Sequence, residues 1–437
     1  MKWSGWYRVR SYVKSSLWVV PFIAMPLALV ATRAAHWIDD RIGWDFLGFG
    51  VPGAQAMLNA IVSATLAFVV FTFGSLLVAI QVASGQLTPR IIATTLLRDQ
   101  VVRYTVGLFL FTLLFALGAI GRIETSVHHF VVFLAALLCL LCFAAFLYLI
   151  DYAARLLRPI SVLTRVGANG LAVIEGVYPD PTLGPAVSNI RSQELGSPDR
   201  VIRHEGTSEI ILAVNLATLV AKAKEAGGVV EFVPQVGDFV AVDEPLLNLY
   251  GGAASLDDGA LRAAIALGSE RTLEQDPTFA FRIVVDIALR ALSAAINDPT
   301  TAVLAIDQLH RMLRMVGKRH LRTDEIADDA GRLLVVFRTP NWEDFVHLAF
   351  SELRQCGAGN LQVVRRLRAM IENLVQTLPA HRHAALHQQL GLLDRELRKH
   401  FNFPEDLALA SVADSQGLGG HSLQGGAKAG LTAISKP

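Results

Sequence analysis

Hydrophobic positions in the first third of the chain form long unbroken runs rather than an alternating pattern. A helix needs about 20 apolar residues to cross the hydrocarbon core of a bilayer. Three runs lack any Asp, Glu, Lys or Arg: Phe46–Pro89, Tyr104–Gly121 and Phe130–Ile150. A fourth run, Ser15–Thr32, is shorter and contains two prolines, which membrane helices tolerate. The pattern predicts four transmembrane helices, and the poor cleavage signal after the first favours an anchor over a signal peptide.

Basic residues flank these runs unequally. One side of the membrane would receive the larger group: Lys2, Arg8, Arg10, Lys14, Arg90, Arg98, Arg103, Arg155, Arg158 and Arg165. The other side would receive only Arg33, Arg41 and Arg122. The positive-inside rule therefore places both termini in the cytoplasm. The three cysteines form no evident disulfide framework, as expected in a reducing compartment.

One face of the second span carries small and weakly polar residues: Asn59, Ser63, Ala67, Gly74 and Gln81. Their spacing places them in one helical stripe. Such a stripe usually marks close helix–helix packing, and the alternative is the lining of a pore built from several copies. The uncharged interior of the spans argues against an ion-coupled transporter. The segment Gln81–Gln100, which follows this span, predicts a short helix beneath the bilayer, and the alternative is a simple connector.

Strand-like alternation replaces the helical pattern after residue 200. Glu209–Val214 predicts a strand, and Asn215 can cap a helix that runs to Glu225. Further alternating segments, including Leu246–Tyr250, predict a small barrel-like region similar to biotinyl or lipoyl carriers. Those carriers modify a lysine in an exposed hairpin, whereas residues 226–317 contain no lysine. A carrier function is therefore rejected, and an interaction or ligand-binding module remains.

The tripeptide Asp-Pro-Thr occurs twice, beginning at Asp276 and at Asp298. Aspartate is a strong N-cap and proline is favoured at the first helical position, so each copy predicts the start of a helix. The first helix and the turn after it supply candidate contacts for a ligand or partner: Arg282, Asp286, Arg290, Asn297 and Asp298. The alternative is a capped corner between two helices. We favour the corner because the capping aspartates already occupy the N-termini where an anion would bind.

Amphipathic helical segments fill the rest of the chain. His381, His383 and His387 invite a metal-site interpretation, but no acidic or cysteine partner accompanies them, so a solvated face is favoured. The predicted fold class is an α-helical membrane protein, with four N-terminal transmembrane helices followed by a cytoplasmic α+β domain. The expected parts are a transmembrane domain (1–155), a β-rich module (156–255), a helical domain (256–415) and a disordered tail (416–437).

Several segments together resemble a known family. They are ASGQLTPRII, VGDFVAVDEPL, EQDPTFAFRIVVDIALRALSAAINDPTTAV and RTPNWEDFVHLAFSELRQCG. With the four spans, they resemble the predicted bacterial membrane proteins called domain of unknown function 2254, as far as about Gly417. Ala294 and Thr300 stand where the family pattern has proline and phenylalanine, without disturbing the Asn297-Asp298-Pro299 cap. The resemblance implies an integral protein of the bacterial cytoplasmic (inner) membrane with a cytoplasmic domain, and it assigns no activity.

Composition narrows the functional classes. The 437 residues are only 18% charged, with a mean hydropathy of +0.44, against about 25% charged in a soluble domain. The net charge of +1 gives no electrostatic reason to expect nucleic acid as a partner. No Walker A loop, zinc-protease motif or nucleophile elbow occurs, so an enzyme is the least supported class and no cofactor or metal is predicted.

The leading prediction is an oligomeric sensor or scaffold in the lipid bilayer, whose cytoplasmic domain binds a ligand or protein partner. The alternative is an oligomeric pore gated by that domain.

Overall fold

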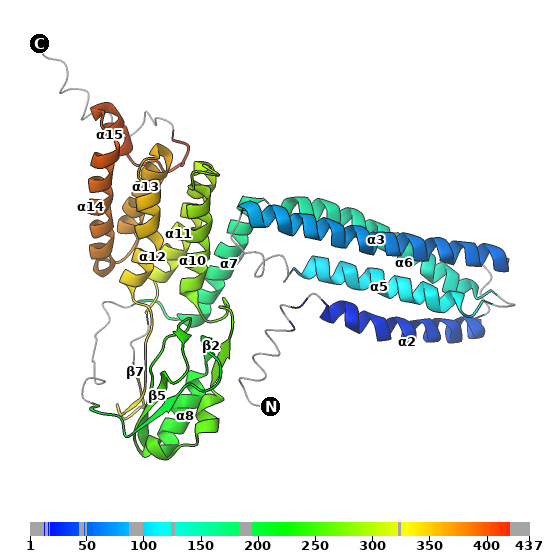
Figure 1. Ribbon diagram of the computed structural model, residues 1–437, viewed down its shortest axis with the longest axis horizontal. Helices are drawn as coiled ribbons and strands as arrows, with labels where there is room; N and C mark the ends of the chain where they lie inside the picture. The colour runs from blue at the N-terminus through cyan, green and yellow to red at the C-terminus, as the bar shows by residue number, and fades with distance from the viewer. Residues whose placement is uncertain are drawn as a thin grey trace, which may run out of the picture. The chain divides into compact units, whose positions relative to one another are not determined.

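The computed structural model describes most of the chain as two compact units that divide between Val162 and Leu163 (Figure 1). The described residues are 13, 16, 18–42, 48, 50–86, 99–123, 127–156, 158–182, 195–321 and 325–419. Most of the segment expected to form a short helix after the second span, residues 87–98, lies outside them. Residues 420–437 of the expected disordered tail lie outside them as well.

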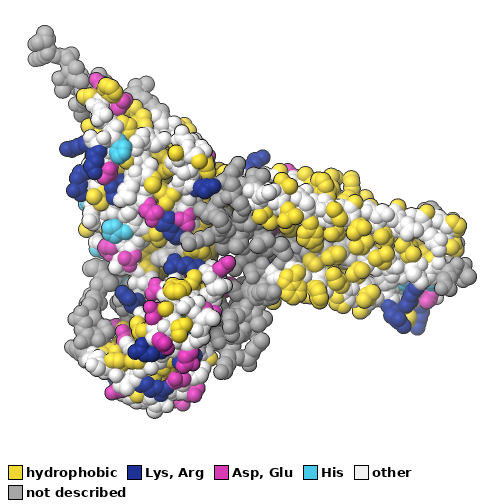
Figure 2. Space-filling model, in the orientation of Figure 1, with side chains coloured by type: hydrophobic (Ala, Val, Ile, Leu, Met, Phe, Trp, Pro, Cys, Tyr) yellow, Lys and Arg dark blue, Asp and Glu magenta, His cyan; other side chains and the backbone are white. Residues whose placement is uncertain are grey.

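Four helices make up the described part of the N-terminal unit: α2 (Val19–Ile42), α3 (Val51–Gln86), α5 (Gln100–Ile120) and α6 (His129–Leu156). Each of the other three packs against α5 (Figure 1). Small and aromatic side chains such as Ala54, Ala135 and Phe115 are buried between them. Large apolar side chains cover the outside, as Figure 2 shows. This distribution is that of a membrane domain, in which lipid contacts the apolar outer surface.

Two glycines of α5 let α2 approach closely. A Cβ atom at Gly107 would lie 2.9 Å from Cγ1 of Val20, and one at Gly118 would lie 3.0 Å from Cγ2 of Thr32. The two glycines are eleven residues apart, which is three helical turns, so they lie on the same face of α5. Small residues at such positions are the usual means by which membrane helices pack tightly.

Among the described residues, five helices rather than the predicted four are long and apolar enough to cross a membrane. The fifth is α7 (Pro159–Val177), which the sequence had placed after the transmembrane domain. Its glycines lie against α11 (Pro299–Gly317): a Cβ at Gly170 would lie 2.5 Å from Sδ of Met312, and Gly167 adjoins Gln308. From Leu163 onward α7 therefore packs within the C-terminal unit.

The strands of the C-terminal unit form two sheets. The larger has the order β1-β5-β3-β8-β7, with bounds Arg200–Arg203, Pro245–Gly251, Gly228–Phe232, Leu333–Phe337 and Glu325–Ala327. The smaller has the order β4-β2-β6, with bounds Phe239–Val240, Glu209–Val214 and Ile265–Gly268. All neighbouring pairs are antiparallel except β3 and β8, which run parallel with Val230 opposite Val335.

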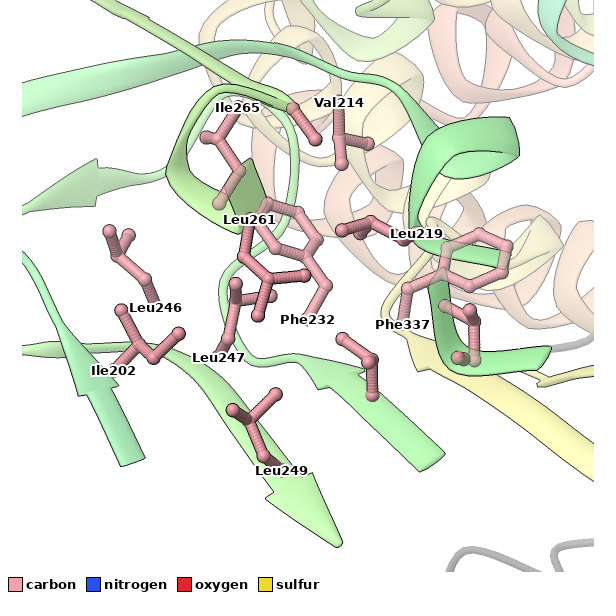
Figure 3. Packing of buried hydrophobic residues seen from close by; sticks show 14 of the residues in the cluster. Ile202, Val214, Leu219, Phe232, Leu246, Leu247, Leu249, Leu261, Ile265 and Phe337 are labelled. Carbon is pink, nitrogen blue, oxygen red and sulfur yellow. The ribbon is translucent and has the colours of Figure 1, made fainter. Parts of the chain in front are cut away.

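One hydrophobic core lies between the two sheets and α8 (Leu216–Ala226). Figure 3 shows its members, among them Ile202 and Leu247 of the larger sheet, Ile265 of the smaller, and Leu219 of α8. The predicted strand Glu209–Val214 and the Asn215 cap of α8 are confirmed. Strands β6, β7 and β8 come from residues beyond 255, a range that was expected to be helical.

Helices fill the rest of the C-terminal unit: α9 (Asp258–Arg262), α10 (Pro277–Ala291), α11, α12 (Trp342–Gly357), α13 (Leu361–Thr377), α14 (His383–His400) and α15 (Pro404–Ala410). Short 3₁₀ turns lie at Gly252–Ser255 and Ala380–Arg382. Both Asp-Pro-Thr copies start helices as predicted: Asp276 caps α10 and Asp298 caps α11. The aromatic rings of Phe281 and Phe345 pack 5.2 Å apart between α10 and α12.

Candidate ligand-binding site

A pocket of about 500 Å³ lies at the carboxyl ends of β3 and β8. Phe232 and Phe337, the last residues of these strands, pair in register and line the pocket. Both belong to the buried core in Figure 3, so that core forms part of the pocket wall. Ligands of open α/β sheets bind outside the carboxyl ends of parallel strands, and this pocket occupies the corresponding position.

Three helices begin around the pocket, and each is already capped by its own side chain. Oδ1 of Asn215 accepts a hydrogen bond from the amide of Thr218 (3.1 Å) at the start of α8. Asp276 caps α10, and Asn341 caps α12 directly after the pocket residues Arg338, Thr339 and Pro340. Each cap already binds an amide at the start of its helix, which reduces what these N-termini offer to an anion.

Asp276 is the most buried charged residue in the pocket lining, with a side chain only 4% exposed. Its Oδ1 accepts hydrogen bonds from the amide of Phe279 (2.9 Å) and from Oγ1 of Thr278. Its Oδ2 accepts none among the described residues, although a buried carboxylate oxygen ordinarily has a donor. Burial raises the pKa of Asp276 above its usual value, against the hydrogen bonding from Thr278 and Phe279 and the charge of Arg271, which lower it.

The groups nearest to Oδ2 of Asp276 are committed elsewhere or too far away. Nη1 of Arg271 lies 3.9 Å from it, beyond hydrogen-bonding distance. The amide of Gly237 donates to the carbonyl of Ile211 (2.8 Å) instead. Gly237 has φ +94°, and a Cβ at this position would lie 2.5 Å from Oδ2. Glycine fits this position for two reasons: it adopts the positive φ of the turn, and its missing side chain leaves room for the carboxylate.

The remaining polar lining is mixed in charge. Glu274 and Arg338 are exposed, and Gln235 is half-buried. Oε1 of Gln275 accepts a hydrogen bond from the amide of Val214 (3.1 Å), which ties the start of α10 to the end of β2. The pocket thus combines an apolar wall with two carboxylates and one guanidinium, a composition suited to a small polar ligand.

Two of the predicted contact residues hold helices together. Arg282 on α10 donates from Nε to Oδ1 of Asp286 (2.6 Å) and from two nitrogens to Glu352 on α12. The guanidinium lowers the pKa of Glu352 below its usual value. These contacts account for Arg282 and Asp286 as an ion-paired link between α10 and α12.

The other three predicted contacts lie at the opposite end of α10 from Asp276. Arg290 is exposed in the last turn of α10, and Asn297 is exposed with a left-handed φ of 47°. Both carboxylate oxygens of Asp298 accept hydrogen bonds from Thr301, one from its amide (3.0 Å) and one from Oγ1. None of the five predicted residues is part of the pocket lining described above. Their role in binding stays a prediction.

The small-residue stripe of α3 faces away from the rest of the N-terminal unit. All five positions are exposed: Asn59, Ser63, Ala67, Gly74 and Gln81. The residues of α3 that are buried lie on the opposite face, at 100° per residue: Ala54, Leu58, Ile61, Thr65 and Thr72. The stripe therefore does not pack against the other described helices of its own chain. Gln81 also lies beyond the apolar span Val51–Val78.

The predicted histidine group lies on α14 and the turn before it. Nε2 of His383 lies 2.9 Å from the carbonyl oxygen of Leu378, and its ring centroid is 6.0 Å from that of His387. Among the described residues no three His, Cys, Asp or Glu side chains are placed to hold a metal ion together.

Sequence reasoning identified Asp276 as a helix cap and missed it as part of a site. The available signal was the position of polar residues directly after hydrophobic strands, as Asn215 follows β2 and Arg338 follows β8. That signal becomes specific only with the parallel pairing of β3 and β8, whose paired residues are 105 positions apart (Val230 and Val335). No local pattern encodes such a pairing.

Comparisons with known proteins identify a matching family and two sequence relatives. The family model described as "Predicted membrane protein (DUF2254)" matches residues 14–373. An uncharacterised protein of Mycobacterium bovis is 26% identical over 420 residues, which cover 92% of this chain and 80% of the relative. An uncharacterised protein of Mycobacterium tuberculosis matches to the same extent. No solved structure matches the chain significantly.

Proposed function

The chain belongs to the predicted membrane protein family DUF2254, and from this premise we propose that it is a membrane-anchored receptor for a small amine-bearing ligand. The ligand would occupy the pocket at the carboxyl ends of β3 and β8, with its protonated amine on Oδ2 of Asp276. In this proposal α2, α3, α5 and α6 cross the bacterial cytoplasmic membrane. The C-terminal unit would lie in the cytoplasm, in keeping with the distribution of arginines and lysines along the chain.

The observation that carries this proposal is the difference between two otherwise similar caps. Asp276 and Asp298 both start an Asp-Pro-Thr segment and both cap a helix. At Asp298 both oxygens accept hydrogen bonds from Thr301. At Asp276 both hydrogen bonds converge on Oδ1, which leaves Oδ2 as a buried acceptor on a pocket-lining residue, with Nη1 of Arg271 3.9 Å away. A cap alone therefore does not account for the placement of Asp276.

An amine suits this acceptor better than an anion or a neutral ligand does. A buried carboxylate without a full set of donors is costly, and a cationic donor relieves that cost by a charge-assisted hydrogen bond. Glu274 adds a second negative charge to the lining, while Arg338 can donate hydrogen bonds to the carboxylate of a zwitterion. A free amino acid is the simplest ligand with both groups.

Helix α7 offers a route from the pocket to the membrane part. Its last residues, Gly176 and Val177, line the pocket together with Tyr178. Its first residue, Pro159, follows the end of α6 at Leu156 by three positions. A ligand that shifts the pocket end of α7 would therefore act on a helix that follows α6 in the chain. From Leu163 onward α7 belongs to the C-terminal unit, where Gly167 adjoins Gln308.

Binding to purified full-length protein in detergent tests this function. Glycine, lysine, arginine and putrescine supply primary amines, and betaine and acetate are matched probes that lack an N–H donor. At least one amine is expected to raise the melting temperature and to bind by calorimetry, whereas betaine and acetate are not. Asp276→Asn keeps a good capping residue and should weaken that binding at least 10-fold, since a charge-assisted hydrogen bond contributes about 1.5–3 kcal/mol.

The matched control is Asp298→Asn, the same replacement at the other cap, which should bind the amine as the unaltered protein does. The proposal is wrong if no amine binds at millimolar concentration, or if Asp276→Asn binds with unchanged affinity.

A second candidate function, an oligomeric pore, is favoured by the exposed stripe of α3. Its small residues lie opposite the buried face of the helix, where a second copy could pack or several copies could enclose a channel. Small residues on a membrane helix are typical of close packing between helices. The cytoplasmic pocket would then regulate the channel.

Ala67→Leu and Gly74→Leu are expected to reduce self-association, because each adds a large side chain to the stripe. Association is measured by native mass spectrometry, and ion flux is measured in liposomes that contain the same protein. Ala144→Leu, at an exposed position of α6, is the control for added bulk on the lipid-facing surface. The pore is favoured if the unaltered protein conducts ions, if these variants lose both flux and association, and if Asn59→Leu also alters the flux. A packing face is favoured if the protein associates but conducts no ions. A monomer in every preparation would exclude both.

A further inference from the structure

The bundle of the N-terminal unit carries a groove between α2 and α5 near the end of α5, at a level beyond which α2 continues to Ile42. Its volume is about 380 Å³, and its lining includes Arg33 on α2 and Arg122 directly after α5. Gly118 contributes to the same lining, at the point where α2 and α5 approach closely. Figure 2 shows basic side chains, with an acidic one beside them, at one end of the largely apolar bundle.

Neither guanidinium in this groove forms an ion pair with another described residue. Arg33 and Arg122 are both exposed. The nearby carboxylates of α2 face His128 instead: Oδ2 of Asp39 lies 3.4 Å from its Nδ1, and Oδ1 of Asp40 lies 3.6 Å from it. Asp39 also accepts a hydrogen bond from the amide of Phe130 (3.2 Å). The groove therefore keeps two positive charges for a partner outside the described chain.

The position of the two arginines along the helices corresponds to the depth of lipid phosphates. Helix α5 has 21 residues, so its length is about 31 Å, close to the thickness of roughly 30 Å for the hydrocarbon core. Arg122 follows its last residue by two positions and thus lies at the boundary of the core. Trp37 on α2, one turn after Arg33, is exposed and stacks with Arg41 (4.7 Å), as interfacial tryptophans commonly do.

We propose that this groove binds an anionic phospholipid, whose phosphate is held by Arg33 and Arg122 together. The groove also has apolar walls for an acyl chain, because Leu29 and Val30 line it and are largely exposed. Basic pockets between transmembrane helices bind acidic headgroups at the cytoplasmic side of membranes, and this groove offers the same chemistry at the opposite side, where the positive-inside rule places Arg33 and Arg122. Arginine suits this role because its planar guanidinium can bind phosphate oxygens in pairs. This site is independent of the cytoplasmic pocket and of the ligand proposed for it.

Native mass spectrometry of the full-length protein tests this site, with phosphatidylglycerol as the probe. Phosphatidylcholine has the same phosphate without net charge, and sn-glycerol 3-phosphate has a phosphate without acyl chains. Phosphatidylglycerol is expected to remain bound and to raise the melting temperature, whereas the other two are not. Each of Arg33→Gln and Arg122→Gln should weaken binding about 5-fold, and the double variant about 30-fold.

Arg41→Gln is the matched control, since it removes the same charge from the same helix outside the groove. It should leave the binding of phosphatidylglycerol within about 2-fold of the unaltered protein. Three results would overturn the proposal: equal binding of phosphatidylcholine, binding of sn-glycerol 3-phosphate as tight as that of the lipid, or an equal loss on Arg41→Gln. The first would show a site without charge selection, the second a site for soluble anions, and the third a general surface potential.

Discussion

Replacing Arg365 with methionine is expected to lower the free energy of unfolding by about 3 kcal/mol and to release the segment that follows α15. Arg365 lies on α13 and is fully buried. Its Nε donates to the carbonyl of Val412 and its Nη1 to the carbonyl of Gly419, both at 3.0 Å. Methionine keeps the apolar stem but removes these donors, and hydrogen bonds from a charged group contribute about 1.5–3 kcal/mol each.

Limited proteolysis of the full-length protein, followed by mass spectrometry, measures the release of residues 411–419, and thermal melting measures the loss of stability. Arg365→Lys should be nearly as damaging as Arg365→Met, because an ammonium group does not reproduce the fork that reaches two carbonyls. Arg398→Met, at an exposed position of α14, is the control and should change neither result. Unchanged protection of residues 411–419 in both Arg365 variants would contradict the role given to this side chain.

The burial of Arg365 could not be predicted from the hydrophobic pattern of α13. The apolar stripe of α13 was evident from the sequence, and its arginines would be assigned to the solvent face. The structure instead buries Arg365, Arg366 and Arg368, each with acceptors supplied by other elements. Arg366, for example, donates to Asp307 of α11 (2.7 Å). Because the partners come from distant parts of the chain, helical periodicity alone could not predict this burial.

The candidate pocket could not be predicted from the sequence either, because it depends on contacts between distant parts of the chain. The caps of α8, α10 and α11 follow from neighbouring residues, and their sequence predictions are confirmed. The pocket exists because β8 pairs in parallel with β3 and brings Phe337 beside Phe232. That tertiary pairing decides which of the two similar Asp-Pro-Thr segments borders a pocket, so the sequence alone could not distinguish Asp276 from Asp298.

In the membrane part, sequence could define the helices but not their inward faces. Both faces of α3 are mostly apolar, because one contacts lipid and the other contacts helices. The stripe from Asn59 to Gln81 was expected to mark packing, or alternatively a pore, and the structure places it on the exposed face. The buried face instead contains residues such as Leu58 and Thr65, which no local rule distinguishes from their neighbours.

Asp276→Asn is expected to make the ligand-free protein more stable at neutral pH, although it removes the group proposed to bind the ligand. Burial raises the pKa of Asp276, so the folded state holds its proton up to a higher pH than the unfolded state does. Below the unfolded pKa of about 3.9 the carboxyl group is protonated in both states and costs nothing. As the pH rises through the raised pKa, the unaltered protein loses stability by about 1.4 kcal/mol for each unit of the shift. Asparagine does not titrate and still caps α10.

Thermal melting of both proteins from pH 4 to pH 8 checks this expectation. The difference in melting temperature should favour Asp276→Asn increasingly as the pH rises and then become constant. Asp298→Asn, measured in parallel, corrects for the general effect of replacing a capping aspartate, since the oxygens of Asp298 are both bonded. A difference that does not depend on pH would show that burial does not hold the proton on Asp276. A bound amine should abolish the difference, because a cation beside Oδ2 stabilises the ionised carboxylate and removes the reason for the shift. The buried carboxylate lowers the stability of the ligand-free protein. Ligand binding accounts for this cost only if the bound amine raises the stability of the unaltered protein to that of Asp276→Asn.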